Sequence, residues 1–223
     1  MRISSRTTGD KTYFILSDLD SQEQEGARNL AFTPYEDGLA IVYPASAPHM
    51  DVFYQQFARV AEEMILQKAG ARPVPWDQAL LALLQRLEGK DIHWWLIGSA
   101  ALAVRGLDVL PGDLDLVTDD AGSHLLGEVL FDALVGPVED ARGWISRWFG
   151  RAFLHARIEW IGAPIPESDH QGVTEFGPTA ESQLESLSWR GYALRVPPLA
   201  IQLAVNERRG LNERVQKIKA KCL

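Results

Sequence analysis

A buried strand that breaks at a glycine and leads straight into a helix is the feature that most limits how this chain folds. Trp94 to Ile97 is apolar, Gly98-Ser99 interrupts the run, and Ala100 to Val104 resumes it. A short apolar run that ends at a glycine is typical of a buried strand, and glycine permits a tight turn. A turn at Pro111-Gly112 then precedes a second apolar strand, Leu114 to Thr118. This order of strand, helix and strand predicts an α/β fold.

Two carboxylates interrupt the second apolar strand. Asp113 and Asp115 are two residues apart, so they project from one face while Leu114 and Leu116 project from the other. Two neighbouring carboxylates repel each other, and a divalent cation such as Mg²⁺ relieves that repulsion. An isolated Asp-x-Asp motif is more often solvated surface, so the pair alone leaves a metal site and a wet strand end as alternatives.

The glycine-serine pair is the second chemical feature. A helix that starts at Gly98 and Ser99 presents free backbone N–H groups to an anion, and Ser99 adds a hydroxyl donor. The alternative is an ordinary helix cap. The order of elements places such an anion site and the aspartate pair at neighbouring strand ends.

A third candidate acid lies in the later segment "FLHARIEWIG". Strand alternation places Arg157 and Glu159 on one face and Ile158 and Trp160 on the other. Glu159 is expected to join the aspartates, with a simple ion pair to Arg157 as the alternative.

The segments "IGSAALAVRG" and "PGDLDLV" resemble the signature of the DNA polymerase β-type nucleotidyltransferase superfamily. The likeness spans roughly residues 92–210, and "RVPPLAIQLAVNERRG" is similar to the small prokaryotic members, which include antibiotic nucleotidyltransferases and abortive-infection type toxin enzymes. The resemblance implies a mixed sheet flanked by helices. It also implies that Gly98 and Ser99 hold a triphosphate and that Asp113 and Asp115 bind Mg²⁺. Glu159 would be the third acid, which helps to activate the acceptor hydroxyl either as a base or as a metal ligand that completes a second metal site.

The implied activity is Mg²⁺-dependent transfer of a nucleoside monophosphate from an NTP to a hydroxyl acceptor, with release of pyrophosphate. Two Mg²⁺ ions are expected during catalysis. The acceptor is a small molecule, a protein or a tRNA. The third acid is a glutamate where aspartate is commoner, and Arg157 shares its face. The alternative is therefore a catalytically inactive member of the fold, acting as a binding or antitoxin-like protein.

Three further side chains are assigned on weaker grounds. Arg105 is expected either to contact a nucleotide phosphate or to stabilise the end of its helix. Trp144 and Trp148 lie near the expected active face and are candidates for stacking on a base.

The composition and the positions of turn-forming residues predict the domain organisation and the general class of protein. We expect a small β-rich appendage over 1–48, a core with leading helices over 49–165, and a strand-and-helix section over 166–223. The 223 residues are 46% hydrophobic and 23% charged, which is ordinary for a globular protein. A net charge of −8 argues against extended nucleic-acid binding. No apolar run approaches a membrane span, and the single cysteine, Cys222, fits a reducing compartment, so a cytoplasmic protein is expected.

Overall fold

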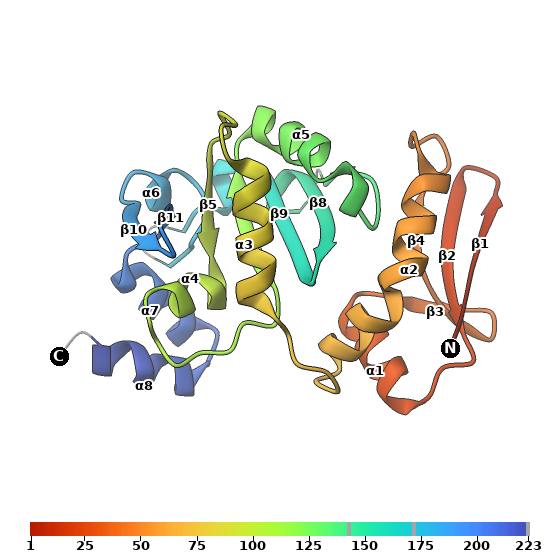
Figure 1. Ribbon diagram of the computed structural model, residues 1–223, viewed down its shortest axis with the longest axis horizontal. Coiled ribbons are helices and arrows are strands. Elements are labelled where there is room, and N and C mark those ends of the chain that lie inside the picture. Colours follow the sequence, from red (N-terminus) through yellow and green to blue (C-terminus); the bar gives the residue numbers. More distant parts are fainter. Residues whose placement is uncertain (142–143, 171–172, 222–223) are drawn as a thin grey trace.

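A mixed sheet lies at the centre of the chain (Figure 1). The computed structural model describes residues 1–141, 144–170 and 173–221. Within these residues the sheet has five strands in the order β5-β6-β9-β8-β7. The pair β6 and β9 is parallel, and the other neighbouring pairs are antiparallel. The strands are β5 (Trp94–Ile97), β6 (Leu114–Thr118), β7 (Glu139–Asp140), β8 (Ser146–Leu154) and β9 (Ala156–Pro164).

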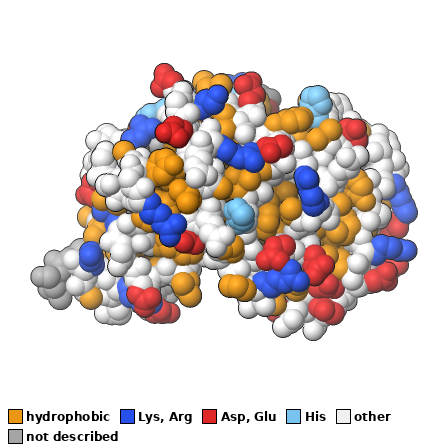
Figure 2. All heavy atoms as spheres, viewed as in Figure 1, with side chains coloured by type: hydrophobic (Ala, Val, Ile, Leu, Met, Phe, Trp, Pro, Cys, Tyr) orange, Lys and Arg blue, Asp and Glu red, His pale blue; other side chains and the backbone are white. Residues whose placement is uncertain are grey.

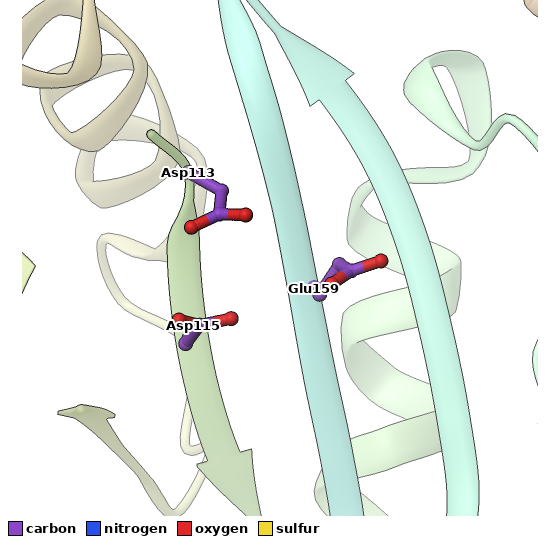
Figure 3. A group of neighbouring side chains, drawn as sticks. All are labelled: Asp113, Asp115 and Glu159. Atoms are coloured by element: carbon purple, nitrogen blue, oxygen red, sulfur yellow. The ribbon is translucent and has the colours of Figure 1, made fainter. Parts of the chain in front are cut away.

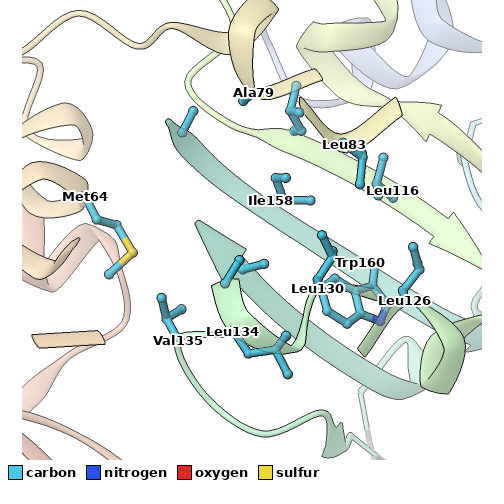
Figure 4. Close-up of a cluster of buried hydrophobic side chains, with 14 of the residues drawn as sticks. Met64, Ala79, Leu83, Leu116, Leu126, Leu130, Leu134, Val135, Ile158 and Trp160 are labelled. Atoms are coloured by element: carbon cyan, nitrogen blue, oxygen red, sulfur yellow. The ribbon is translucent and has the colours of Figure 1, made fainter. Parts of the chain in front are cut away.

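One face of this sheet forms the main hydrophobic core. Leu114, Leu116, Ile158 and Trp160 are each no more than 1% exposed and pack in one cluster with side chains of the covering helices (Figure 4). Those helices are α3 (Trp76–Leu87) and α5 (Asp120–Val129), and the short helix η1 (Phe131–Ala133) follows α5. The helix α4 (Gly98–Val104) connects β5 with β6. The predicted α/β class, a mixed sheet flanked by helices, is confirmed.

The N-terminal region is a separate antiparallel sheet with the strand order β1-β2-β4-β3. A turn at Glu36-Asp37 joins two of its strands, because Tyr35 pairs with Gly38. A helix within this region was not expected from the sequence, since its residues are mostly polar. The elements are β1 (Arg2–Thr8), β2 (Lys11–Ser17), α1 (Ser21–Asn29), β3 (Thr33–Tyr35) and β4 (Gly38–Pro44).

The long helix α2 (Met50–Lys68) contacts both the N-terminal sheet and the central one. The Phe57 ring stacks on Phe14 and Phe32, at centroid distances of 5.5 and 5.7 Å. Met64 belongs to the same core cluster as the central sheet (Figure 4). Near the end of the helix, Gln67 Nε2 donates to the carbonyl of His155 at 2.8 Å, in the turn between β8 and β9. One helix therefore joins the two sheets.

The C-terminal section packs beside β5 (Figure 1). The predicted polar loop between β9 and β10 includes residues 171–172, which lie outside the described residues, as does Cys222. No helix in the described ranges is both long enough and apolar enough to span a membrane. The elements are η2 (Pro166–Ser168), α6 (Pro178–Glu181), β10 (Glu185–Trp189), β11 (Tyr192–Val196), α7 (Leu199–Arg208) and α8 (Asn212–Lys221).

Candidate active site

Three carboxylates converge on the face of the central sheet opposite the main core. Asp113 directly precedes β6 and Asp115 is the second residue of that strand, so alternation gives both the same face. The parallel pairing of β6 with β9 sets Glu159 beside Asp115. One oxygen from each carboxylate lies within 4.8 Å of the others, and Figure 3 shows the two strands that present them. The three acids expected to share a site therefore lie together, while their catalytic roles stay predictions.

Basic side chains pair with the two outer acids. Arg157 forms an ion pair with Asp113 and a second one with Glu159, at 3.3 Å from Nη1 to Oε1. Lys68, at the end of α2, lies 3.4 Å from Asp113, and Arg151 Nε lies 3.0 Å from Glu159. The ion pair between Arg157 and Glu159, expected as an alternative to the metal role, thus coexists with the convergence of the acids.

Asp115 is the acid that these cations leave without a partner. It forms no ion pair with any residue in the described part of the chain. Burial, together with the charges of Asp113 and Glu159, raises the pKa of Asp115 to about 7. Asp113 differs: burial would raise its pKa, but the charge and hydrogen bond of Arg157, helped by Lys68, hold it below its usual value. A half-buried carboxylate that forms no ion pair, and whose pKa stays raised although the charge of Arg157 lowers it, fits a bound cation.

The turn at Gly98 is packed against this unpaired carboxylate. Gly98 has φ of +66°, which L side chains rarely adopt, and a Cβ atom there would lie 2.9 Å from Asp115 Oδ2. Glycine is therefore required by both the backbone and the site. Ser99 follows in the first turn of α4 and is 5% exposed.

The backbone N–H of Gly98 donates a hydrogen bond to a glutamate that the sequence analysis did not identify. Glu175 Oε2 accepts a hydrogen bond from Gly98 N at 2.8 Å and another from Gln202 Nε2 at 3.1 Å. Gln202 also donates to the Gly98 carbonyl at 3.3 Å. In this structure the Gly98 N–H therefore donates to a side chain of the same molecule, and its use as a phosphate donor stays a prediction. Glu175 lies 77 positions from Gly98 in a polar loop, and no local pattern indicates the contact.

Arg105 contacts the C-terminal section. As the C-terminal cap of α4 it donates from Nη2 to Glu185 at 2.6 Å and to the Pro197 carbonyl at 2.7 Å. None of its contacts with the described residues joins it to the three acids. Both expected roles of Arg105, at the helix end and at a phosphate, stay predictions.

An aromatic pocket of about 390 Å³ opens beside Asp115 and Glu159. Its walls include Trp144 and Phe149, whose rings meet edge to face at 5.4 Å, and Phe176. Trp144 is 53% exposed and remains available for stacking. Trp148 does not line this pocket, because its Nε1 donates to Asp120 at 2.8 Å and its ring packs on His124.

Comparisons with known proteins find no sequence family and a weak likeness in structure. No model of a protein family matches the chain, and no curated protein sequence matches it. A crystal structure of a candidate nucleotidyltransferase from Thermotoga maritima is similar at 17% sequence identity, with a TM-score of 0.48. The match covers 65% of this chain and 90% of that one.

Proposed function

We propose that this chain is a metal-dependent nucleotidyltransferase, which moves a nucleoside monophosphate from an NTP to a hydroxyl group. The observation that carries the proposal is the convergence of Asp113, Asp115 and Glu159 within 4.8 Å. The half-buried Asp115 supports it, because that carboxylate forms no ion pair with any described residue. These acids are the ones to which the sequence resemblance assigns metal binding and catalysis.

The reaction exchanges one bond to phosphorus for another. The acceptor oxygen bonds to the α-phosphorus while the bond from that phosphorus to the oxygen of the leaving pyrophosphate breaks. The hydroxyl proton passes to a carboxylate of the triad, where Glu159 holds the position of the third acid. Asp113 and Asp115 would hold Mg²⁺, which would lower the pKa of the hydroxyl and offset the charge of the pyrophosphate. Trp144 offers the base a flat surface for stacking.

The acceptor belongs to one of three classes, namely the hydroxyl of a small molecule, of a protein side chain or of a tRNA end. Acidic and basic side chains are interspersed over the face of the molecule in Figure 2. Together with the net charge of −8, this favours an acceptor that does not require a long basic track. A screen of labelled NTPs against members of each class identifies it by the label transferred.

The decisive test pairs turnover with metal binding. Mn²⁺ titration followed by electron paramagnetic resonance should show binding to the wild type, and labelled NTP with Mg²⁺ should release pyrophosphate. Asp115→Asn should lose both without unfolding. Asp91→Asn, which removes a charge from an exposed position, serves as the control. Retained turnover in Asp115→Asn would contradict the assignment.

A second candidate function is supported by the ion pairs of the outer acids. Arg157 bridges Asp113 and Glu159, and an inactive binding protein would keep such a cluster in place of a metal. Thermal denaturation separates the two functions. A ligand at about 100 times its Kd adds about 2.7 kcal/mol to the free energy of unfolding. If no NTP with Mg²⁺ stabilises the wild type, the inactive alternative is favoured.

A further inference from the structure

Glu175 places a carboxylate where the proposed function requires a phosphate group. Its Oε2 atom accepts from Gly98 N at 2.8 Å and from Gln202 Nε2 at 3.1 Å, and the side chain of Gln202 returns to the Gly98 carbonyl. Glu175 is only 5% exposed. These hydrogen bonds form a closed ring that includes the N–H and carbonyl groups of Gly98, the Glu175 carboxylate and the Gln202 amide.

Two arginines place positive charge near Glu175, but burial outweighs it and disfavours the charged carboxylate. Burial raises the pKa of Glu175, against the smaller lowering by the Gly98 and Gln202 hydrogen bonds and by the charges of Arg209 and Arg214. Neither arginine forms an ion pair with a residue of the described ranges. Gln202 Oε1 is also buried without a hydrogen-bond partner. Because a buried carboxylate without an ion pair costs free energy, stability alone does not account for Glu175.

We infer that Glu175 is an internal competitor for a phosphate group of the nucleotide. Its carboxylate holds the anion position at Gly98, and the triphosphate enters when the Glu175 side chain leaves. The inference rests on the proposed function, because Gly98 packs against Asp115 and so places this anion beside the proposed metal site. Carboxylate and phosphate oxygens both accept from N–H groups and are attracted by guanidinium groups. The exchange therefore substitutes one anion for another.

The side chain can leave without moving its backbone. Trp95 Nε1 donates to the Glu175 carbonyl at 3.0 Å, which anchors the main chain on β5. The adjacent residue, Phe176, lines the pocket beside Asp115, as does Arg209. A Glu175 side chain that rotates away from Gly98 would therefore lie near the pocket and a guanidinium group, without a need to break the backbone hydrogen bond to Trp95.

The test uses inorganic tripolyphosphate as the probe, in the presence of a chelator so that no divalent metal takes part. Isothermal titration calorimetry compares the wild type with Glu175→Gln, which keeps the shape of the side chain and removes its charge. We expect at least a tenfold lower Kd for Glu175→Gln. Glu167→Gln removes the same charge from an exposed position on the same connecting segment and should match the wild type. Equal affinity of Glu175→Gln and the wild type would overturn the inference.

A measurement on the wild type keeps the inference testable if Glu175→Gln fails to fold. Tripolyphosphate should shift the amide NMR signal of Gly98 and the carboxyl carbon signal of Glu175 together. If it shifts neither, Glu175 is a structural anchor only. Failure of the proposed function is distinguishable: tighter tripolyphosphate binding by Glu175→Gln without NTP turnover upholds the competitor and rejects the enzyme. Turnover by the wild type, with no gain in Glu175→Gln, rejects the competitor alone.

Discussion

The two faces of the central sheet are built from the same strands but have opposite energetics. On one face Leu116 and Trp160 are buried among apolar side chains, and their burial stabilises the fold. On the other face their sequence neighbours, Asp115 and Glu159, carry charge into a partly buried site. Because side chains alternate along a strand, the same two strands stabilise the fold with the residues on one face and form a destabilising charged site with the residues on the other.

The largest change in the free energy of unfolding should come from a substitution on the apolar face. Trp160→Ala removes a side chain that is 1% exposed and should lower the free energy of unfolding by about 3–5 kcal/mol. Trp144→Ala is the matched control, because Trp144 lies beside the charged face and is 53% exposed. Its effect should stay below about 1 kcal/mol. Urea denaturation measures both, and equal losses would show that the two faces do not differ as described.

The next largest change in the free energy of unfolding should come from Asp113, the aspartate that is paired with Arg157. Asp113→Asn should lower the free energy of unfolding at pH 7 by about 3 kcal/mol, because Arg157 is left partly buried with fewer negative partners. The pKa of Asp113 is lowered in the folded state, so its stabilisation exists above its unfolded pKa and is lost as pH falls through the folded one. The deficit of the variant should therefore shrink in acid. A deficit that is independent of pH would rule out the ion pair as its cause.

Replacing Asp115 should change the free energy of unfolding in the opposite direction from replacing Asp113. Its pKa of about 7 in the folded state lies above the unfolded value, so the wild type loses stability as pH rises from about 4 through 7. Asp115→Asn carries no charge and should be more stable than the wild type at pH 8. The expected gain is at least about 1.4 kcal/mol, the free energy of one pKa unit. Denaturation curves from pH 4 to 8 should show the gap opening, and a variant less stable at pH 8 would contradict the raised pKa.

A smaller effect is expected at the turn that supports Asp115. Gly98→Ala imposes a side chain on a backbone with φ of +66°, which costs about 1–2 kcal/mol. The new Cβ would also press on Asp115 Oδ2, so Mn²⁺ affinity should fall together with stability. Gly89→Ala is a matched control, because Gly89 has φ of +70° with no atom near its Cβ position. It should lose stability alone.

Local sequence signals predicted individual strands, and the family resemblance predicted that the three acids share a site. Strand alternation put Asp113 and Asp115 on one face, and the apolar run located β6 correctly, whereas the pairing of β6 with β9 that brings Glu159 to them has no local signal. The signals failed where contacts join distant segments. Lys68 reaches the site from a helix that packs on another sheet, and Glu175 reaches Gly98 across 77 positions. Periodicity reports which way a residue faces, and it does not report which distant segment covers it.

The helix α2 has a consequence for how the molecule comes apart. A helix of 19 residues is about 28 Å long, and its hydrophobic side chains are divided between two sheets. Phe57 would lose its stacking partners if the N-terminal sheet detached, and Met64 would lose the core if α2 followed that sheet. Neither half, taken with α2, would keep all the hydrophobic side chains of that helix buried. The domain boundary expected at residue 48 stays a prediction, and we expect α2 to couple the unfolding of the two halves.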